Sequence, residues 1–312
     1  MKSIVLVLPY FGKWPVWFEA HLLSIAKNPT INWLFITDCE IPIHYPKNIR
    51  FVSTTLQELN VKVNAVVGAT VPLTPRKFCD LKPAYGAIFQ DYISGYDFWG
   101  FCDMDIIWGD IRKFMTSDIL DNYDIISSRK EAISGHFTLF SNTSPLINLY
   151  RHVPNYQFLF EQPKFMWFDE SVLTNFLKAT TKFRIFWPAI LLNQERGIDS
   201  HQEYYLNKWQ WNNGNLLEIR NDNATNEIMY LHFINWKKTI KNCDVVFSDN
   251  PAIFYISYTS IHYELFSKSA FLLNAIKNKF NGYYCKAYSR NKKKKFKKLL
   301  KRIKKRLINK QF

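Results

Sequence analysis

Two aspartates separated by one residue follow a largely apolar segment in the first half of the chain. Asp103 and Asp105 come directly after the stretch from Tyr96 to Cys102, which reads as a buried strand. In an extended segment, side chains two residues apart lie on the same side. Two carboxylates placed in this way can hold one hard divalent cation, Mn²⁺ or Mg²⁺, and such a cation can neutralise a departing pyrophosphate. The spacing therefore predicts a metal site.

The triplet alone is a weak signal. With 15 Asp in 312 residues, an Asp-x-Asp triplet arises by chance about 0.7 times per chain of this composition. The alternative reading is a pair of carboxylates that make turn hydrogen bonds at a strand end. What favours a metal site is the position of Asp103 and Asp105 at the end of a central apolar strand.

Short apolar runs alternate with helical patterns along the chain. Predicted strands are Ile4–Leu8, Trp33–Thr37, Ile49–Ser53, Tyr96–Cys102, Tyr123–Ser127, His136–Ser141 and Ile228–Ile234. Predicted helices are Trp17–Lys27, Leu81–Ile93, Ser144–Arg151 and Tyr263–Phe280, with the last packed on the body and 154–226 less regular. This alternation predicts an α/β fold with a mostly parallel sheet, whose ligands bind beyond the carboxyl ends of the strands.

The charge of the chain is concentrated at one end. Lys and Arg number 41 against 26 Asp and Glu, and 14 of these bases and none of the acids lie between Lys286 and Phe312. The first 285 residues therefore carry 27 bases and 26 acids, which argues against a protein that coats nucleic acid.

Five dispersed cysteines without a Cys-x-x-Cys pattern argue against a disulfide framework or a structural zinc site, and favour a reducing cytosol. The apolar run Ile4–Leu8 is too short for a signal peptide or a membrane span.

The strand and Asp-x-Asp segment resembles the GT-A glycosyltransferases, in particular the sugar transferases of bacterial capsular polysaccharide and lipopolysaccharide synthesis. Other similar segments are Leu8-Pro-Tyr-Phe-Gly12, Arg76-Lys-Phe-Cys-Asp-Leu-Lys-Pro-Ala-Tyr-Gly86, Ser134-Gly-His-Phe-Thr138, Phe168-Asp-Glu170 and Tyr230-Leu-His-Phe-Ile-Asn-Trp-Lys-Lys238. The resemblance covers residues 1–240. It implies a Rossmann-like sheet with helices on both faces and a nucleotide-sugar donor.

On the donor side, the resemblance implies that Pro9 and Tyr10 lie where this fold places the nucleotide base. Arg76 and Lys82 are basic residues ahead of Pro83, the residue through which the predicted helix is entered. They could bind phosphate, or merely pair with a nearby acid. Asp38 follows the second predicted strand and could bind ribose or base hydroxyls, or cap the next turn.

The resemblance also implies a third metal ligand and a floor for the sugar pocket. His232 would be the third ligand, and Lys237 or Lys238 would contact the diphosphate; a lone histidine in an apolar run can equally be a packed core residue. Gly135 would allow close backbone approach to a ligand, with His136 pointing at the sugar, unless it is an ordinary hairpin glycine.

Asp169 and Glu170 resemble an acidic motif on the acceptor side. Because adjacent side chains diverge on a strand or a helix, we expect only one of them to enter the pocket. That residue either orients the acceptor hydroxyl in a retaining, same-face transfer or acts as a general base in an inverting one. The region of His232 is similar to that of retaining members of the group.

The basic terminus has the pattern of an amphipathic helix. Between Lys292 and Lys310 the apolar residues form one stripe, with Lys and Arg on the remaining face: Phe296, Leu299, Leu300, Ile303 and Leu307. Such a helix is typical of an anionic membrane surface. Nucleic-acid binding by the same charges and a solvated tail are the alternatives.

Together these features predict a cytoplasmic enzyme on the inner face of the cell membrane. It would transfer a hexose or N-acetylhexosamine from a UDP-sugar to a lipid-linked oligosaccharide, and it would bind no nucleic acid. Residues 1–250 would form the GT-A domain, 251–285 a helical extension packed on it, and 286–312 the membrane-surface tail. A nucleotidyltransferase also uses paired aspartates, although no Gly-rich loop follows the first strand, and a non-catalytic membrane-docking protein would need only the tail.

Overall fold

The first strand, β1 (Ile4–Tyr10), is apolar on both faces. Leu6 and Leu8 point into one hydrophobic core, and Val5 and Val7 point into another. Because successive side chains alternate across a strand, β1 must lie inside a sheet that is covered on both sides. The computed structural model describes residues 1–180, 182–187, 192–193, 209–219, 225–234, 237–238, 240–257 and 259–265, with isolated positions from 267 to 300.

The main sheet has seven strands in the order β3-β2-β1-β4-β7-β6-β8. The other six strands are β2 (Ile31–Thr37), β3 (Ile49–Ser53), β4 (Phe98–Cys102), β6 (Ile125–Ser127), β7 (Phe137–Ser141) and β8 (Ile185–Phe186). All neighbouring pairs are parallel except those that β7 makes with β4 and β6. The mostly parallel sheet expected from the sequence is therefore confirmed, and the carboxyl ends of β1 to β4 share one edge.

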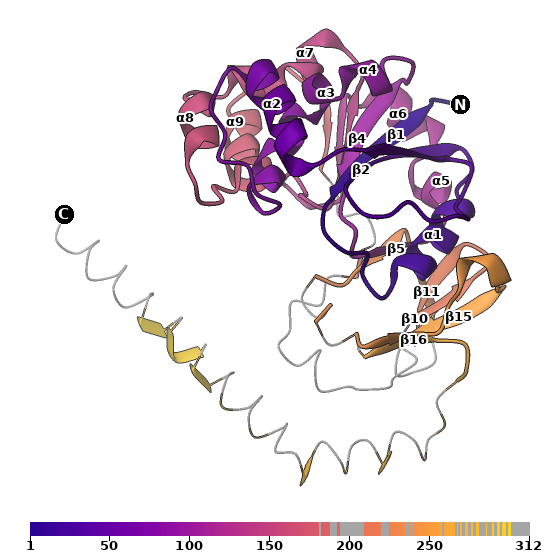
Figure 1. The fold of residues 1–312 in the computed structure, drawn as a ribbon. Coiled ribbons are helices and arrows are strands. Elements are labelled where there is room, and N and C mark those ends of the chain that lie inside the picture. Colours follow the sequence, from indigo (N-terminus) through magenta and orange to yellow (C-terminus); the bar gives the residue numbers. More distant parts are fainter. Residues whose placement is uncertain are drawn as a thin grey trace.

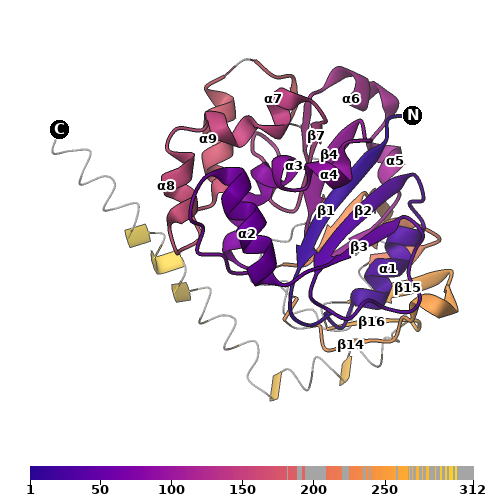
Figure 2. The ribbon, with the colours of Figure 1, turned by 45° about the horizontal axis from the view of Figure 1, so that its top comes forward.

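Helices cover both faces of this sheet (Figures 1 and 2). One face carries α2 (Leu56–Val67), α3 (Tyr85–Ile88), α4 (Gln90–Ile93), α7 (Ser144–Ile147), α8 (Tyr156–Glu161) and α9 (Leu173–Lys178). The other face carries α1 (Phe18–Ala26), α5 (Ile111–Phe114) and α6 (Ser117–Asn122). The α/β fold class predicted from the sequence is thus confirmed.

A second, antiparallel-rich sheet lies against α1 and was not expected. Its order is β12-β11-β10-β15-β16-β14, with the bounds β10 (Trp209–Asn212), β11 (Asn215–Ile219), β12 (Thr225–Ile228), β14 (Asn242–Cys243), β15 (Ile253–Ile256) and β16 (Ser260–His262). Ala20 and Leu23 of α1 pack into its hydrophobic core. Between the two sheets runs a short three-stranded one, β5-β13-β9, made of β5 (Ile106–Trp108), β13 (Tyr230–His232) and β9 (Leu192–Asn193).

The predicted helix Leu81–Ile93 is instead three short pieces. A 3-10 helix, Lys77–Ala84, is followed by α3 and α4. Pro83 lies inside the first piece, where it has no N–H to donate and its ring crowds the preceding turn, so a regular α-helix cannot form there. The predicted strand Ile228–Ile234 is likewise divided at Met229 between β12 and β13.

The segment 251–285 differs from the packed helical extension predicted for it. It begins with β15 and β16, because the alternating apolar residues of these strands complete the second sheet. The described positions of its later part are helical, yet Leu272, Leu273 and Phe280 are exposed and not packed on the body. Ile303 and Leu307 of the predicted amphipathic stripe lie outside the described residues. Among the helices in the described part of the chain, none is both long and apolar enough to cross a membrane.

The pairing of β4 with β7 depends on a glycine. A side chain at Gly100 would overlap the carbonyl oxygen of Thr138 and lie 2.7 Å from Leu139 Cδ2, and neither neighbour can move without shifting β7. We expect Gly100→Ala to lower the free energy of unfolding by about 3 kcal/mol in urea denaturation, because overpacking a rigid core is costly. Gly95→Ala, which meets nothing within 4 Å, is the control; equal stability of the two variants would contradict this view of the β4–β7 contact.

Candidate functional site

Asp103 and Asp105 lie in the turn that joins β4 to β5, at the carboxyl edge of the main sheet. The turn is held by Trp17, whose indole N–H donates to the carbonyl oxygen of Met104 at 3.0 Å. Asp105 is 4% exposed, whereas Asp103 is half-buried. The two carboxylates therefore face the interior of the site and not bulk solvent.

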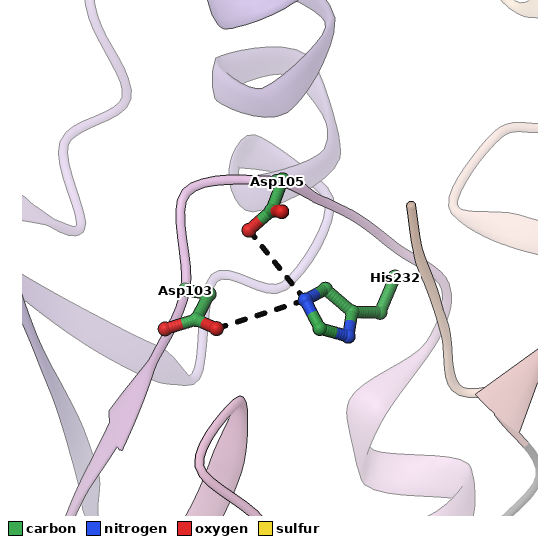
Figure 3. Close-up of side chains that lie close together, drawn as sticks. All are labelled: Asp103, Asp105 and His232. Atoms are coloured by element: carbon green, nitrogen blue, oxygen red, sulfur yellow. Dashed lines mark ion pairs between the residues drawn. The ribbon is translucent and has the colours of Figure 1, made fainter. Parts of the chain in front are cut away.

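His232 reaches the same place from more than a hundred residues away. The antiparallel pair β13–β5 sets His232 opposite Ile106, and the backbone N–H of Phe233 donates to the carbonyl oxygen of Asp105 at 3.1 Å. His232 Nε2 then lies 3.6 Å from Asp103 Oδ2 and 3.5 Å from Asp105 Oδ1 (Figure 3). Figure 3 shows all three side chains converging on one point.

This arrangement fits a divalent cation. One ligand atom of each of the three residues lies within 4.8 Å of the other two. His232 is 2% exposed, and within the described part of the chain neither of its ring nitrogens has a hydrogen-bond partner. Buried polar atoms normally have partners, and the distances of 3.5 and 3.6 Å are too long for hydrogen bonds but suit groups that share an ion. Carboxylate oxygens and an imidazole nitrogen are ordinary ligands of divalent metal ions.

A second layer of side chains supports His232. The ring of His136 packs on it with centroids 4.2 Å apart, and His136 Nδ1 is 2.9 Å from the hydroxyl of Tyr230. That hydroxyl in turn donates to Ser128 Oγ. Burial holds the pKa of His136 well below its usual range, and the nearby cation Lys82 adds to this effect. His136 is thus a buried neutral group behind the site, whereas the sequence analysis had it pointing at a sugar.

Lys82 enters the site from the 3-10 helix and lies between the carboxylates of Asp103 and Asp169. Its ammonium lies 2.6 Å from Asp103 Oδ1 and 4.0 Å from Asp169 Oδ2, and it donates to the carbonyl oxygen of Gly135. Burial alone would lower the pKa of Lys82, but the neighbouring Asp103 and then other negative groups raise it well above its usual value. The side chain is therefore a fixed positive charge in a buried position.

Gly135 brings the start of β7 against Asp169 and Glu170. A methyl group at this position would lie 2.7 Å from Asp169 Oδ2 and 3.2 Å from Glu170 Oε1. The backbone N–H of Gly135 donates to Glu170 Oε1 at 3.3 Å, and Glu170 also pairs with Arg129 at 3.3 Å. The glycine thus allows a close approach, as the sequence suggested, but the approach is to protein carboxylates.

Of the two acids, Asp169 is the buried one. It is 3% exposed, and burial raises its pKa to about 7, an effect that Lys82 offsets in part and Glu170 and Asp103 reinforce. Within the described part of the chain, Asp169 Oδ1 has no hydrogen-bond partner. The carboxyl group therefore changes its charge near neutral pH and keeps one oxygen available for a ligand.

Of the two lysines after His232, only Lys237 reaches the site. Its ammonium lies 2.9 Å from Asp105 Oδ2, whereas Lys238 is exposed to solvent. Burial alone would raise the pKa of the Asp105 carboxyl, but His232 and Lys237 hold it below its usual range.

Several of these residues border one pocket of about 420 Å³ at the carboxyl edge of β1 and β4. Its walls include Pro9, Tyr10, Arg76, Lys82, Asp105 and Lys237. Asp38 is not part of the lining; it is exposed and accepts a hydrogen bond of 2.7 Å from the backbone N–H of Gly12, so it orders the loop after β1. Half of the predicted site residues therefore line this cavity: Pro9, Tyr10, Arg76, Lys82, Asp103, Asp105 and Lys237. His232 is not in the lining but lies next to Asp103 and Asp105, and Gly135 and Asp169 lie next to Lys82. Asp38, His136, Glu170 and Lys238 are not in the lining either.

The sequence analysis missed the groups that hold this site in place. Lys77 and Asp80 form a fully buried ion pair at 3.0 Å, and Asp80 also accepts from the backbone N–H groups of Met166 and Phe168. On the other side, His21 Nδ1 lies 2.6 Å from the carbonyl oxygen of Ile106. The only sequence signal for such groups is a polar residue in an apolar stretch.

The pKa of Asp169 predicts how stability depends on pH. Between its unfolded pKa of about 4 and its folded pKa of about 7, the folded state binds the extra proton, so this group reduces stability as pH rises through that window. We expect the gain in unfolding free energy on Asp169→Asn to be about 2 kcal/mol larger at about pH 8 than at about pH 5. Asp121→Asn, an exposed position on α6, is the control in the same melting experiments. A gain that is independent of pH would contradict the raised pKa.

Comparison with known proteins gives a family, and the solved structures with a partial likeness include two glycosyltransferases. The galactosyltransferase LgtC in complex with donor and acceptor sugar analogues matches with a TM-score of 0.32 and 13% identity, over 55% of this chain and 69% of that chain. Mouse xyloside xylosyltransferase 1 in its apo form matches with a TM-score of 0.30 and 11% identity, over 60% of this chain and 79% of that chain. No curated protein matches the sequence. The profile of DUF6625, a family of unknown function, matches residues 6–265, and the chain therefore belongs to this family.

Proposed function

We propose that this protein is a metal-dependent glycosyltransferase that uses a UDP-sugar as donor. The observation that carries the proposal is the convergence of Asp103, Asp105 and His232 at the carboxyl edge of a mostly parallel sheet, beside a pocket that contains the buried cation Lys82. Divalent cations bind diphosphates, and ligands of such sheets lie at this edge. The resemblance of the surrounding motifs to GT-A enzymes supports the same reading.

In this proposal a metal ion and basic side chains of the pocket together supply the positive charge that a diphosphate needs. A Mn²⁺ or Mg²⁺ ion held by Asp103, Asp105 and His232 would supply neutralisation of the leaving group. Lys237 and Arg76, which border the same pocket, offer further positive charge to the phosphate oxygens. Pro9 and Tyr10 border the pocket at the end of β1, where a nucleoside could lie.

Asp169 is the proposed acceptor-side group, because it is buried and Glu170 is engaged with Arg129. We propose a retaining transfer of a hexose or N-acetylhexosamine, in which Asp169 orients the acceptor hydroxyl through its free oxygen. In an inverting transfer the same carboxylate would remove the proton, and its pKa of about 7 suits a base at neutral pH. Analysis of the product anomer by NMR separates the two: an inverted centre contradicts the retaining proposal.

The proposed acceptor is a lipid-linked glycan of surface polysaccharide synthesis, met at the cytoplasmic face of the cell membrane. Support comes from the end of the chain, where residues 265–312 contain 17 Lys and Arg and no acid. The described helical positions Phe296, Leu299 and Leu300 expose apolar side chains within this cationic segment. Apolar and cationic side chains together favour an anionic lipid surface.

The catalytic proposal predicts turnover that depends on the three metal-site residues. We expect the purified protein to release UDP from at least one of UDP-glucose, UDP-galactose and UDP-N-acetylglucosamine in the presence of Mn²⁺, and to lose this activity with EDTA. Asp103→Asn, Asp105→Asn and His232→Gln should each lower kcat/KM by about 100-fold or more, because each removes a ligand of the charge that stabilises the leaving group.

The exposed change Asp121→Asn is the matched control and should leave turnover unaltered. Release of pyrophosphate from a nucleoside triphosphate and a sugar phosphate, in place of UDP release, would favour a nucleotidyltransferase. Unaltered turnover in all three variants would remove the metal site from the reaction.

The membrane proposal predicts a loss of vesicle binding that is separate from any loss of turnover. Deleting residues 286–312 removes 14 positive charges, and each near-surface Lys or Arg contributes on the order of 1 kcal/mol at an anionic surface. We expect the truncated protein to lose sedimentation with phosphatidylserine-containing vesicles while it keeps UDP release from soluble donors. Equal sedimentation of the full and truncated chains would contradict a role of this segment at membranes.

A further inference from the structure

Trp167 is a large aromatic residue that the fold does not bury. Its side chain is 53% exposed, and its backbone has φ = +55°, at the start of the π-helix Phe168–Val172. A bulky residue in the left-handed region is strained, and such positions are concentrated at functional sites. Single-turn π-helices have the same tendency. Exposure and strain at one tryptophan need a reason other than core packing.

The backbone on both sides of Trp167 is clamped from within. Asp80 accepts hydrogen bonds from the N–H groups of Met166 at 2.9 Å and Phe168 at 3.0 Å. Lys77 holds Asp80 in position, and both side chains are fully buried. Two fixed N–H groups around one residue leave it little freedom, so the indole is presented to solvent by a rigid support.

The exposed indole belongs to a strip that leads into the pocket. The rings of Phe165 and Trp167 are 5.0 Å apart, and the guanidinium of Arg76 lies 4.1 Å from the centroid of Phe165. Arg76 is also part of the pocket wall. Aromatic surface and a cationic donor therefore extend without a break from the proposed donor cavity to Trp167.

Asp169 supplies the second feature that points to a ligand. It lies two residues after Trp167, is 3% exposed, and within the described residues its Oδ1 has no hydrogen-bond partner. A buried oxygen without a partner is costly unless a ligand completes it. A hydroxyl donor that rests on the aromatic strip could do so.

We propose that Phe165, Trp167 and Arg76 form the subsite on which a pyranose ring of the acceptor stacks while Asp169 accepts a hydrogen bond from one of its hydroxyls. This inference rests on the proposed glycosyltransferase function. The apolar C–H face of a pyranose packs on an aromatic ring, and an indole supplies a wide face at little cost in side-chain entropy. The guanidinium of Arg76 offers donors to ring hydroxyls at the edge of the stack.

Saturation-transfer difference NMR tests the subsite directly. The full chain, with Mn²⁺ and UDP present, is probed with methyl α- and β-pyranosides of glucose, galactose, mannose and N-acetylglucosamine. We expect at least one of these to receive saturation on the C–H protons of one ring face. Trp167→Ala should weaken that binding by about tenfold or more, and Trp167→Phe should restore most of it, because the aromatic face is retained.

Phe158→Ala, at a 61% exposed aromatic residue on α8, is the matched control and should leave the signal unaltered. UDP–Mn²⁺ binding, followed by thermal shift, should be equal in the wild type and all three variants. If UDP–Mn²⁺ binds but no pyranoside gives a signal that depends on Trp167, the subsite is wrong and the donor proposal stands. If UDP–Mn²⁺ fails to bind the wild type, the glycosyltransferase proposal itself fails.

Discussion

One buried ammonium group holds the candidate site together. Lys82 Nζ contacts Asp103, the carbonyl oxygen of Gly135 and Asp169, which belong to the end of β4, the segment before β7 and the π-helix. Without this charge, the carboxylates of Asp103 and Asp169 would repel one another in a part of the site that water solvates poorly. A buried cation that is paired and hydrogen-bonded is tolerated, whereas buried carboxylates without one are not. The rest of the site can therefore be understood as what is arranged around Lys82.

The metal triad depends on a different constraint, the pairing of β5 with β13. Asp103 and Asp105 are local in sequence, but His232 reaches them only because Phe233 and Leu231 anchor β13 in the core shared with the second sheet. That sheet packs on α1 and so ties the late part of the chain to the main sheet. The second sheet thus has a positional role: it carries no proposed site residue, yet it fixes the strand from which the third ligand comes.

Local sequence patterns were sufficient for six of the seven strands of the main sheet, all but β8, and for the acidic pair. The apolar runs that form β1 to β4 are short, uniform and bounded by polar residues, so their period and length identify them. The second sheet was missed, although the Asn213-Gly214 turn between β10 and β11 is a strong hairpin signal. Both residues of this turn adopt positive φ, as two-residue hairpin turns of this kind require. Trp209 and Trp211 are fully buried in that hairpin.

What the sequence could not supply are distances between segments. Arg76, Lys77, Asp80 and Lys82 lie close together in the chain, yet the structure gives them opposite roles: Lys77 and Asp80 are buried as a clamp, and Lys82 and Arg76 border the pocket. On a 3-10 helix, residues three apart lie above one another, so Lys77 can meet Asp80. A regular α-helix, as predicted for the later part of this segment, would have distributed these charges differently.

Three unfavourable features of the described structure lie at or beside the site. The buried Asp169 oxygen, the unpaired nitrogens of His232 and the strained backbone of Trp167 all lie around or beside the pocket. At α2, by contrast, the capping box of Thr55 and Glu58 follows ordinary helix-capping preferences. Violations of local preference that lie together are typical of functional sites. An ion between the carboxylates and the imidazole, and a hydroxyl donor at Asp169, would satisfy the unpartnered buried atoms, which is why the proposed two-substrate transferase explains this site better than a docking protein.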